Sequence, residues 1–227
     1  MTFIAPDESE AVEIEDLKTR VLSEEPALAS SVNFSSTTVM RFYRGQKKNA
    51  DAALESLKKY IHWRVAEDVD SIDDRKAEFQ REIDAKKVAV GYRDLHGRPA
   101  GYVFVHRHNA YDRNVNEVKL QTIWTLEALR KAAKPEEERF VISVDLSRFS
   151  MRNMDYEALK CQVDILQSHY PETLESAYII DSPFIFSACW RVIRPWLDPV
   201  TAKKVNFIKR SELHKYFDVH TVPKEED

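Results

Sequence analysis

The chain has 227 residues and a mass of 26.5 kDa, which is enough for one domain with a substantial hydrophobic core. Only 4 residues are glycine, and neither G-x-G-x-x-G nor a Walker sequence can be written through them, which argues against a glycine-cradled nucleotide site. Lys and Arg number 34 against 38 Asp and Glu, and the net charge of -4 does not indicate nucleic-acid binding.

The first 86 residues are expected to be helical. Residues 1–34 read as an acidic lead-in, with one helix predicted over residues 11–24, before Pro26. Residues 35–86 read as a helical module. The spacing of its apolar residues predicts a helix from Ser36, which is an N-cap candidate, and two more over residues 50–65 and 72–86.

From residue 87 onward, strands are predicted to alternate with helices. Strands are expected at residues 88–90, 100–105, 140–144, 176–180 and 204–208, and helices at residues 114–133, 153–169, 184–196 and 212–217. Such alternation implies βαβ crossovers and a mostly parallel sheet. The sequence therefore predicts an α/β domain over residues 87–227, with helices flanking the sheet, behind an N-terminal helical bundle.

Four segments carry recognisable motifs in a consistent order. Residues 39–44 read VMRFYR and are followed by Trp63-Arg64, residues 94–99 read DLHGRP, and residues 145–147 read DLS. The fourth segment, residues 169–204, contains YPE, YIID and LDPVTAKK. Together these segments resemble the CRAL-TRIO lipid-binding family, and within it the phosphatidylinositol/phosphatidylcholine transfer protein branch. The resemblance covers residues 36–208 and implies an α/β fold with a lipid pocket.

The most apolar segment is the helix predicted over residues 184–196. A helix that is apolar around most of its circumference is either packed in a core on two sides or faces hydrocarbon. The resemblance implies the second alternative, because this position is the family's gate helix, which covers the lipid pocket and meets the membrane during exchange. The residues expected to form the gate and the acyl pocket are Phe184, Phe186, Trp190, Ile193 and Trp196.

A headgroup site is expected next to this helix. Asp198 can cap a helix that starts at Pro199, which places Thr201 and Lys204 on one face of its first turn. Spacing alone favours an ordinary capped turn with a solvated lysine over a phosphate site. In the proteins that this chain resembles, these positions and the glutamate of YPE, here Glu172, bind the inositol phosphate headgroup.

Two positions depart from the family pattern. Gln46 stands where the family's phosphoinositide-binding members have an arginine, and a neutral amide cannot replace a charged bidentate phosphate partner. Phe140 and Ile142 stand where phosphatidylcholine-binding members carry hydroxyl residues. The expected ligand is therefore a single phospholipid, phosphatidylinositol in the first place, with Gln46 counted among the headgroup residues.

The remaining features favour a binding protein over an enzyme. His106 and His108 alternate like two metal ligands, but no third ligand stands beside them, and no G-x-S-x-G nucleophile motif is present. No catalytic site, metal or cofactor is therefore expected besides the bound phospholipid.

No secretory signal opens the chain, and the two cysteines, Cys161 and Cys189, fit reduced core residues. We expect a cytoplasmic protein that meets membranes transiently. Its expected partners are a phospholipid, a membrane surface and a protein such as a lipid-modifying kinase, without nucleic acid. The alternative is a sensor or scaffold that holds another hydrophobic small molecule and does not transfer it.

Overall fold

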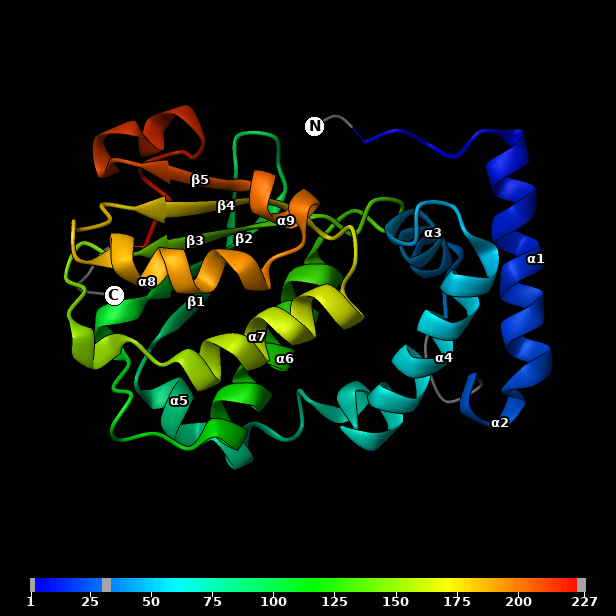
Figure 1. The fold of residues 1–227 in the computed structure, drawn as a ribbon, viewed down its shortest axis with the longest axis horizontal. Helices are drawn as coiled ribbons and strands as arrows, with labels where there is room; N and C mark the ends of the chain where they lie inside the picture. Colours follow the sequence, from blue (N-terminus) through cyan, green and yellow to red (C-terminus); the bar gives the residue numbers. More distant parts are fainter. Residues whose placement is uncertain (1–2, 30–33, 224–227) are drawn as a thin grey trace.

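The computed structural model describes residues 3–29 and 34–223, and it divides them into a helical module and an α/β part (Figure 1). The helical module contains α1 (Glu8–Glu24), α2 (Pro26–Ala29), α3 (Ser36–Gly45) and α4 (Ala50–Ala66). Three of these helices begin at polar caps, because the side chains of Asp7, Ser35 and Asn49 accept hydrogen bonds from backbone N–H groups of the first turn. The N-cap of α3 is Ser35, one residue before the predicted cap.

The acidic N-terminal helix is part of the helical module's core. Ile14, Leu17 and Val21 of α1 are buried together with Val39 and Phe42 of α3 and with apolar residues of α4. The sequence predicts residues 1–34 as a lead-in before the helical module of residues 35–86, and in the structure α1 packs directly on α3 and α4.

The helix predicted over residues 72–86 is wrong. The chain there forms a turn with short 3-10 helices at Val69–Ser71 and Lys76–Phe79, followed by one short α-helix, α5 (Gln80–Asp84). Ile72 and Phe79 are fully buried against apolar residues of the following helix, and Arg75 donates a hydrogen bond to the carbonyl of Glu67 at 2.5 Å. Tertiary burial of these few side chains therefore outweighs the helical spacing that the sequence shows.

The α/β part contains a sheet with the strand order β1-β2-β3-β4-β5. Its strands are β1 (Val88–Arg93), β2 (Pro99–Phe104), β3 (Phe140–Asp145), β4 (Leu174–Ile180) and β5 (Val205–Ile208). β1 is antiparallel to β2, and the other neighbours are parallel. The predicted α/β class and mostly parallel sheet are confirmed.

Helices cover one face of the sheet and the C-terminal segment covers the other (Figure 1). The helices are α6 (Val115–Ala132), α7 (Tyr156–His169) and α8 (Phe186–Ile193), which continues into a 3-10 helix at Arg194–Trp196. A short helix, α9 (Pro199–Lys203), leads into β5, and a 3-10 helix at Arg210–Lys215 lies near the chain's end. On the opposite face, Tyr102, Val141 and Tyr178 are buried with Leu213 and Phe217 of the C-terminal segment.

Candidate functional site: an apolar cavity beneath the sheet

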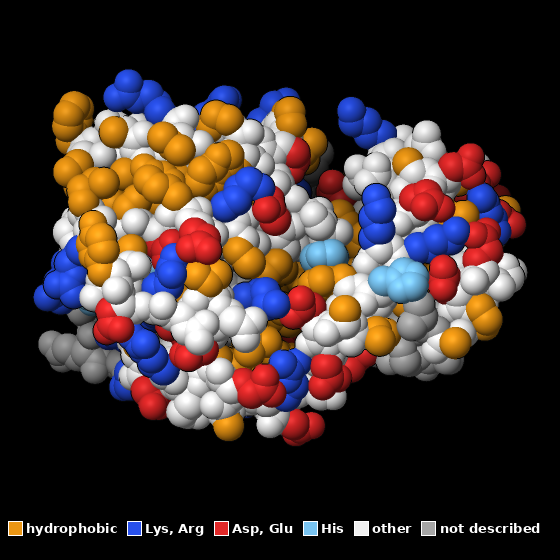
Figure 2. Space-filling model, turned by 60° about the horizontal axis from the view of Figure 1, so that its bottom comes forward, with side chains coloured by type: hydrophobic (Ala, Val, Ile, Leu, Met, Phe, Trp, Pro, Cys, Tyr) orange, Lys and Arg blue, Asp and Glu red, His pale blue; other side chains and the backbone are white. Residues whose placement is uncertain are grey.

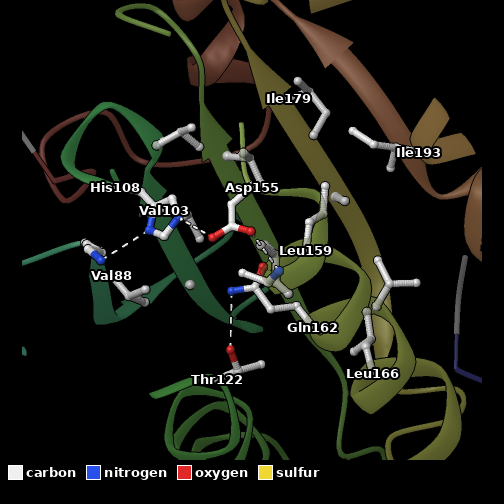
Figure 3. Close-up of a pocket in the computed structure, with 18 of the residues that line it drawn as sticks. Val88, Val103, His108, Thr122, Asp155, Leu159, Gln162, Leu166, Ile179 and Ile193 are labelled. Atoms are coloured by element: carbon white, nitrogen blue, oxygen red, sulfur yellow. Dashed lines mark hydrogen bonds and ion pairs between the residues drawn. The ribbon is translucent and has the colours of Figure 1, made fainter. Parts of the chain in front are cut away.

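A cavity of about 320 Å³ lies between the helical face of the sheet and the helices α6, α7 and α8 (Figure 3). This volume is within the range of small-molecule binding sites. The strand register explains why the wall is apolar. Gly101 of β2 pairs with Ile142 of β3, which pairs with Ala177 of β4, which pairs with Val205 of β5, and all four line the cavity. Because side chains alternate between the faces of a sheet, such a row points to one side.

A second row runs parallel to the first. It consists of Val103, Val144 and Ile179, which are paired in register and also line the cavity. Aliphatic residues of the helices close the space from the other side, among them Val118 and Leu126 of α6 and Leu159 and Leu166 of α7. The site can therefore hold an apolar body or chain between two aliphatic surfaces.

The helix α8 forms the third side of the cavity, and it carries the predicted gate residues. Phe186, Trp190 and Ile193 line the cavity. Phe186 packs edge-on against Phe149, and Trp190 packs against Phe207 of β5. These three predicted residues are therefore part of the cavity wall, and their contact with acyl chains stays a prediction.

The other two predicted gate residues do not line the cavity. Phe184 is 94% exposed to solvent and precedes the first turn of α8. Trp196 lies past Pro195, in the 3-10 turn that ends the helix, and packs edge-on against Tyr156 of α7. The α-helix thus starts two residues later than the predicted helix over residues 184–196 and passes into a 3-10 turn after Ile193, and neither Phe184 nor Trp196 is among the residues that line the cavity.

Exposed apolar side chains surround α8. They are Phe184, Ile185, Val192, Val200 and Phe207. Phe184 and Phe207 also border a shallow depression together with Pro183 and Trp190. Figure 2 shows hydrophobic side chains gathered on the α/β part of the molecule, with Lys and Arg side chains beside them. A concentration of exposed apolar groups of this kind marks an interaction surface.

Of the predicted headgroup residues Thr201, Lys204 and Glu172, only Thr201 is among the residues that line the cavity. As predicted, Asp198 caps α9, and its carboxylate accepts hydrogen bonds from the N–H groups of Val200 and Thr201 and from the Thr201 hydroxyl. The burial of Asp198 raises the pKa of its carboxyl, but these hydrogen bonds outweigh burial and hold the pKa below its usual range.

Lys204 and Glu172 are brought together by the fold. The Lys204 ammonium lies 3.8 Å from the Glu172 carboxylate. Glu172 itself has a left-handed backbone with φ of 59°, a conformation that costs a non-glycine residue energy and recurs at functional sites. An ammonium and a carboxylate this close to each other, one helical turn from Thr201 of the cavity wall, are chemically suited to a hydroxylated phosphate group.

Gln46 lies at the C-terminal end of α3, and its amide donates a hydrogen bond to the Ser56 hydroxyl at 3.0 Å. The preceding residue, Gly45, touches the α/β part, because a Cβ there would come within 3.0 Å of the Pro171 ring. The end of α3 is thus held next to the segment that contains Glu172, while the Gln46 side chain is bonded within the helical module.

At the end of the cavity near β1, a group of polar side chains was not anticipated from the sequence. Lys87 donates a hydrogen bond to Glu82 at 2.6 Å, and its ammonium lies 3.2 Å from Nδ1 of His108. The other ring nitrogen of His108, Nε2, is 3.1 Å from the Asp155 carboxylate (Figure 3). An Nε2–H donor and an Nδ1 acceptor satisfy both contacts with a neutral ring. Burial and the nearby Lys87 ammonium lower the pKa of His108, in agreement with that state.

Asp155 anchors this polar group to α7. Its carboxylate caps the helix by accepting from the N–H of Ala158, and it also accepts from the Arg113 guanidinium at 2.7 Å. Burial raises the pKa of the carboxyl, but these hydrogen bonds prevail and lower it to about 2. A further polar pair lines the cavity, in which Gln162 donates to the Thr122 hydroxyl at 3.3 Å (Figure 3).

The polar group contains His108, one of the two histidines that alternate like metal ligands. Among residues 3–29 and 34–223, no cluster of three or more His, Cys, Asp or Glu side chains is arranged to hold a metal ion. The signal for the polar group in the sequence is weak, because Glu82, His108 and Asp155 lie far apart along the chain and only the fold joins them.

Residues 83–226 match the CRAL/TRIO domain. The chain belongs to the CRAL-TRIO family. A CRAL-TRIO domain-containing protein of Schizosaccharomyces pombe is 34% identical over 195 residues, which cover 82% of this chain and 44% of that protein. A phosphatidylinositol transfer protein of Eremothecium gossypii is 29% identical over 204 residues, covering 85% of this chain and 47% of that protein.

Further relatives of this CRAL-TRIO chain include a SEC14 cytosolic factor of Eremothecium gossypii, 27% identical over 207 residues that cover 82% of this chain and 67% of that protein. The resemblance to the phosphatidylinositol/phosphatidylcholine transfer branch is thereby confirmed. The crystal structure of Sfh5 superposes with a TM-score of 0.73 and 16% identity, covering 95% of this chain and 85% of Sfh5, which confirms the fold. The chain spans about half the length of the first two relatives. None of the helices in the described residues is both long and apolar enough to cross a bilayer.

Proposed function

We propose that this chain binds one phospholipid, phosphatidylinositol in the first place, and carries or presents it between membranes. The observation that supports this most is the aliphatic cavity between the sheet and α8, beside a surface of exposed apolar side chains. The acyl chains would occupy the cavity, and the headgroup would lie at the end with Thr201, Lys204 and Glu172. No covalent chemistry is involved.

The helix α8 acts as the gate in this proposal. In water, displacing α8 exposes the apolar side chains of Phe186, Trp190 and Ile193, at a cost of roughly 25 cal/mol for each Å² uncovered. At a membrane surface the acyl region replaces the cavity as the apolar environment, so opening costs much less. Phe184, which already points into solvent, would make the first contact with the bilayer.

The gate is tested by a charge at Phe184. We expect Phe184→Asp to lower the rate of lipid transfer between vesicles by an order of magnitude or more, since a carboxylate resists entry into the acyl region. Because Phe184 is 94% exposed, the melting temperature should not change. The matched control is Val12→Asp, on an exposed position of α1. An unchanged transfer rate in Phe184→Asp would refute the gate.

The headgroup site is tested by removing its cation. Lys204→Ala, alone and with Thr201→Ala, should reduce phosphatidylinositol uptake about tenfold or more, because charge-assisted hydrogen bonds are each worth roughly 1.5–3 kcal/mol. Lys203→Ala is the control, because Lys203 is the neighbouring exposed lysine of α9. Uptake is measured from vesicles with labelled phosphatidylinositol, and equal uptake by all variants would contradict the assignment of the headgroup.

A second function is favoured by one observation. The amide of Gln46 is bonded to Ser56, so the end of α3 supplies no cationic side chain from this position to a phosphate. The alternative is that the chain holds another hydrophobic molecule and presents it to a protein partner. Mass spectrometry of the lipid that copurifies with the protein decides between them, since a one-to-one phosphatidylinositol complex supports the first function and a different ligand supports the second.

A further inference from the structure

The carboxylate of the proposed headgroup site stands on a short turn between two buried residues. Pro171 and Glu172 connect Tyr170, at the end of α7, to Thr173, just before β4, and Tyr170 and Thr173 are 1% and 0% exposed. The Thr173 hydroxyl donates a hydrogen bond to the Tyr170 carbonyl at 2.7 Å, which closes the turn. Within it, Glu172 has a φ of 59°, a left-handed conformation that a non-glycine residue keeps only where its surroundings impose it.

Part of these surroundings belongs to the helical module. Arg41 of α3 is 1% exposed, and its guanidinium donates a hydrogen bond to the carbonyl of Pro171 at 3.2 Å. That carbonyl and the N–H of Glu172 belong to one planar peptide unit, so the bond fixes the orientation of the plane from which Glu172 continues. Arg41 is itself held in place, because its Nε lies 2.7 Å from the Glu138 carboxylate.

A second contact with the turn comes from the end of the same helix. Gly45, the last residue of α3, packs against Pro171 so closely that a Cβ at position 45 would lie 3.0 Å from the Pro171 Cβ. A side chain there would force the helix or the turn to move by a few tenths of an ångström. The φ of Gly45 is not positive, so the missing side chain serves this close approach and not an unusual backbone conformation.

Both contacts bear on where the Glu172 carboxylate lies. It is 3.8 Å from the Lys204 ammonium, and this pair is the charged part of the proposed headgroup site. Groups that recognise a ligand have to be held within about 0.5 Å of their productive positions. A small displacement of the turn, or a rotation of the peptide between Pro171 and Glu172, is therefore enough to move the carboxylate away from a headgroup hydroxyl.

We propose that α3, through Arg41 and Gly45, positions Glu172 and thereby sets the selectivity of the chain for a headgroup with hydroxyl donors. Arg41 and Gly45 are positioning residues, because they act on the lipid through the turn. A carboxylate only accepts hydrogen bonds, so a correctly placed Glu172 selects a hydroxylated headgroup over one of equal charge without hydroxyls. This inference rests on the proposed function, in which Glu172 contacts the headgroup.

The test is a competition between two lipids that share their acyl chains and their phosphodiester charge. The purified chain is incubated with phosphatidylcholine vesicles that carry equal amounts of phosphatidylinositol and phosphatidylmethanol, whose headgroup has no hydroxyl. The lipids that remain with the separated protein are quantified by mass spectrometry. We expect the unmodified chain to retain at least about tenfold more phosphatidylinositol, the effect of one hydrogen bond to a charged group. Glu172→Ala should retain the two lipids nearly equally.

Two variants of α3 test the positioning. Gly45→Ala leaves every polar group of the site in the chain and should lower the preference to about threefold or less, because the turn is displaced. Its melting temperature should hardly change, since alanine is a better helix former than glycine. Arg41→Lys keeps a cation beside Glu138 but loses the planar fork that also reaches Pro171, and it should lower the preference as well. Total lipid uptake should stay the same in both.

Arg64→Lys is the matched control for Arg41→Lys. Arg64 is another buried arginine of the helical module, 4% exposed, and it also pairs with a glutamate of the α/β part. Its hydrogen bonds go to Tyr60, Asp70 and Glu127. The control should therefore lose comparable stability in chemical denaturation and keep the full preference for phosphatidylinositol.

The outcomes separate this inference from the proposed function. A full preference in both Gly45→Ala and Arg41→Lys, or an equal loss of preference in Arg64→Lys, contradicts the positioning role and leaves the headgroup site intact. Equal retention of the two lipids by the unmodified chain refutes the proposed headgroup site, and the positioning role with it.

Discussion

At the scale of single residues, His169 shows how burial makes a side chain sensitive to pH. Its ring stacks on the indole of Trp63, with centroids 3.8 Å apart and planes within 4°. Burial lowers the pKa of His169 from 6.5 to about 4. The unfolded chain therefore binds a proton between these values that the folded chain does not bind. The free energy of unfolding accordingly falls as the pH decreases from about 6.5 toward 4.

His169→Phe keeps an aromatic ring on Trp63 and removes the titration. Between pH 7 and pH 5 the unmodified chain should lose about 2 kcal/mol more unfolding free energy than the variant, a figure that follows from the shift in pKa. Urea unfolding at the two pH values measures the difference. His108 titrates in both proteins and cancels in the comparison. Equal losses in the two proteins would mean that His169 is protonated in the folded state.

At the scale of elements, the strand rows determine how much ligand the cavity holds. Ala177 stands in the middle of β4, between Ile142 and Val205, and its small side chain leaves space in the cavity. A larger group at this position fills space that a ligand would otherwise occupy.

Ala177→Phe should accordingly lower the amount of lipid that copurifies, by roughly half or more, and leave the melting temperature unchanged or higher, because apolar surface becomes buried. Ala177→Ser adds little volume and serves as the control. Full lipid occupancy in Ala177→Phe, measured by native mass spectrometry, would show that ligand does not pass this part of the sheet.

Most elements could be predicted because their signals are local. Apolar runs and turn residues predicted each strand of the sheet, and Asp198-Pro199 predicted the start of α9. The helix over residues 72–86 failed because burial of Ile72 and Phe79 against α6 is a tertiary effect. The gate helix was predicted to extend over residues 184–196, beyond both ends of α8, because the residues that flank α8 are as apolar as those within it.

The candidate site was predictable only in part. The motifs YPE and LDPVTAKK, which can be recognised in the sequence, contain Glu172, Thr201 and Lys204. The carboxylate of Glu82 and its neighbours give no such signal, because their hydrogen bonds join α5, β1 and α7 across the fold. Arg41 and Arg64 were recognised as motif residues, but their partners were not, since Glu138 and Glu127 lie far along the chain.

At the scale of the whole molecule, a chain of buried ion pairs joins the helical module to the α/β part. Arg64 of α4 lies 3.0 Å from Glu127 of α6, and Arg130 bridges Glu127 to Glu138. Glu138 in turn lies 2.7 Å from Arg41 of α3. Burial raises the pKa of Glu127, but the two guanidinium groups prevail and lower it to about 2. A network of ion pairs therefore connects the two parts, with Arg41 and Arg64 of the helical module bound to Glu138 and Glu127 of the α/β part.

Glu127→Ala leaves two buried guanidinium groups without their shared partner. We expect a loss of about 3–5 kcal/mol in unfolding free energy, the usual effect of breaking a buried pair. Glu136→Ala, at an exposed position between α6 and β3, should change it by less than about 0.5 kcal/mol. Chemical denaturation of both variants provides the measurement, and similar stabilities would show that the network contributes little.

The two faces of the sheet also bear on how this molecule can diverge over evolutionary time. Gly101, Ile142 and Ala177 face the cavity, whereas Tyr102, Val141 and Tyr178, each the next residue in its strand or the one before it, face the C-terminal segment. Changes of size on the first face alter the shape of the cavity, and changes on the second alter the packing against the C-terminal segment. Substitutions at alternate positions of a strand can therefore reshape the cavity over evolutionary time without altering the packing on the opposite face.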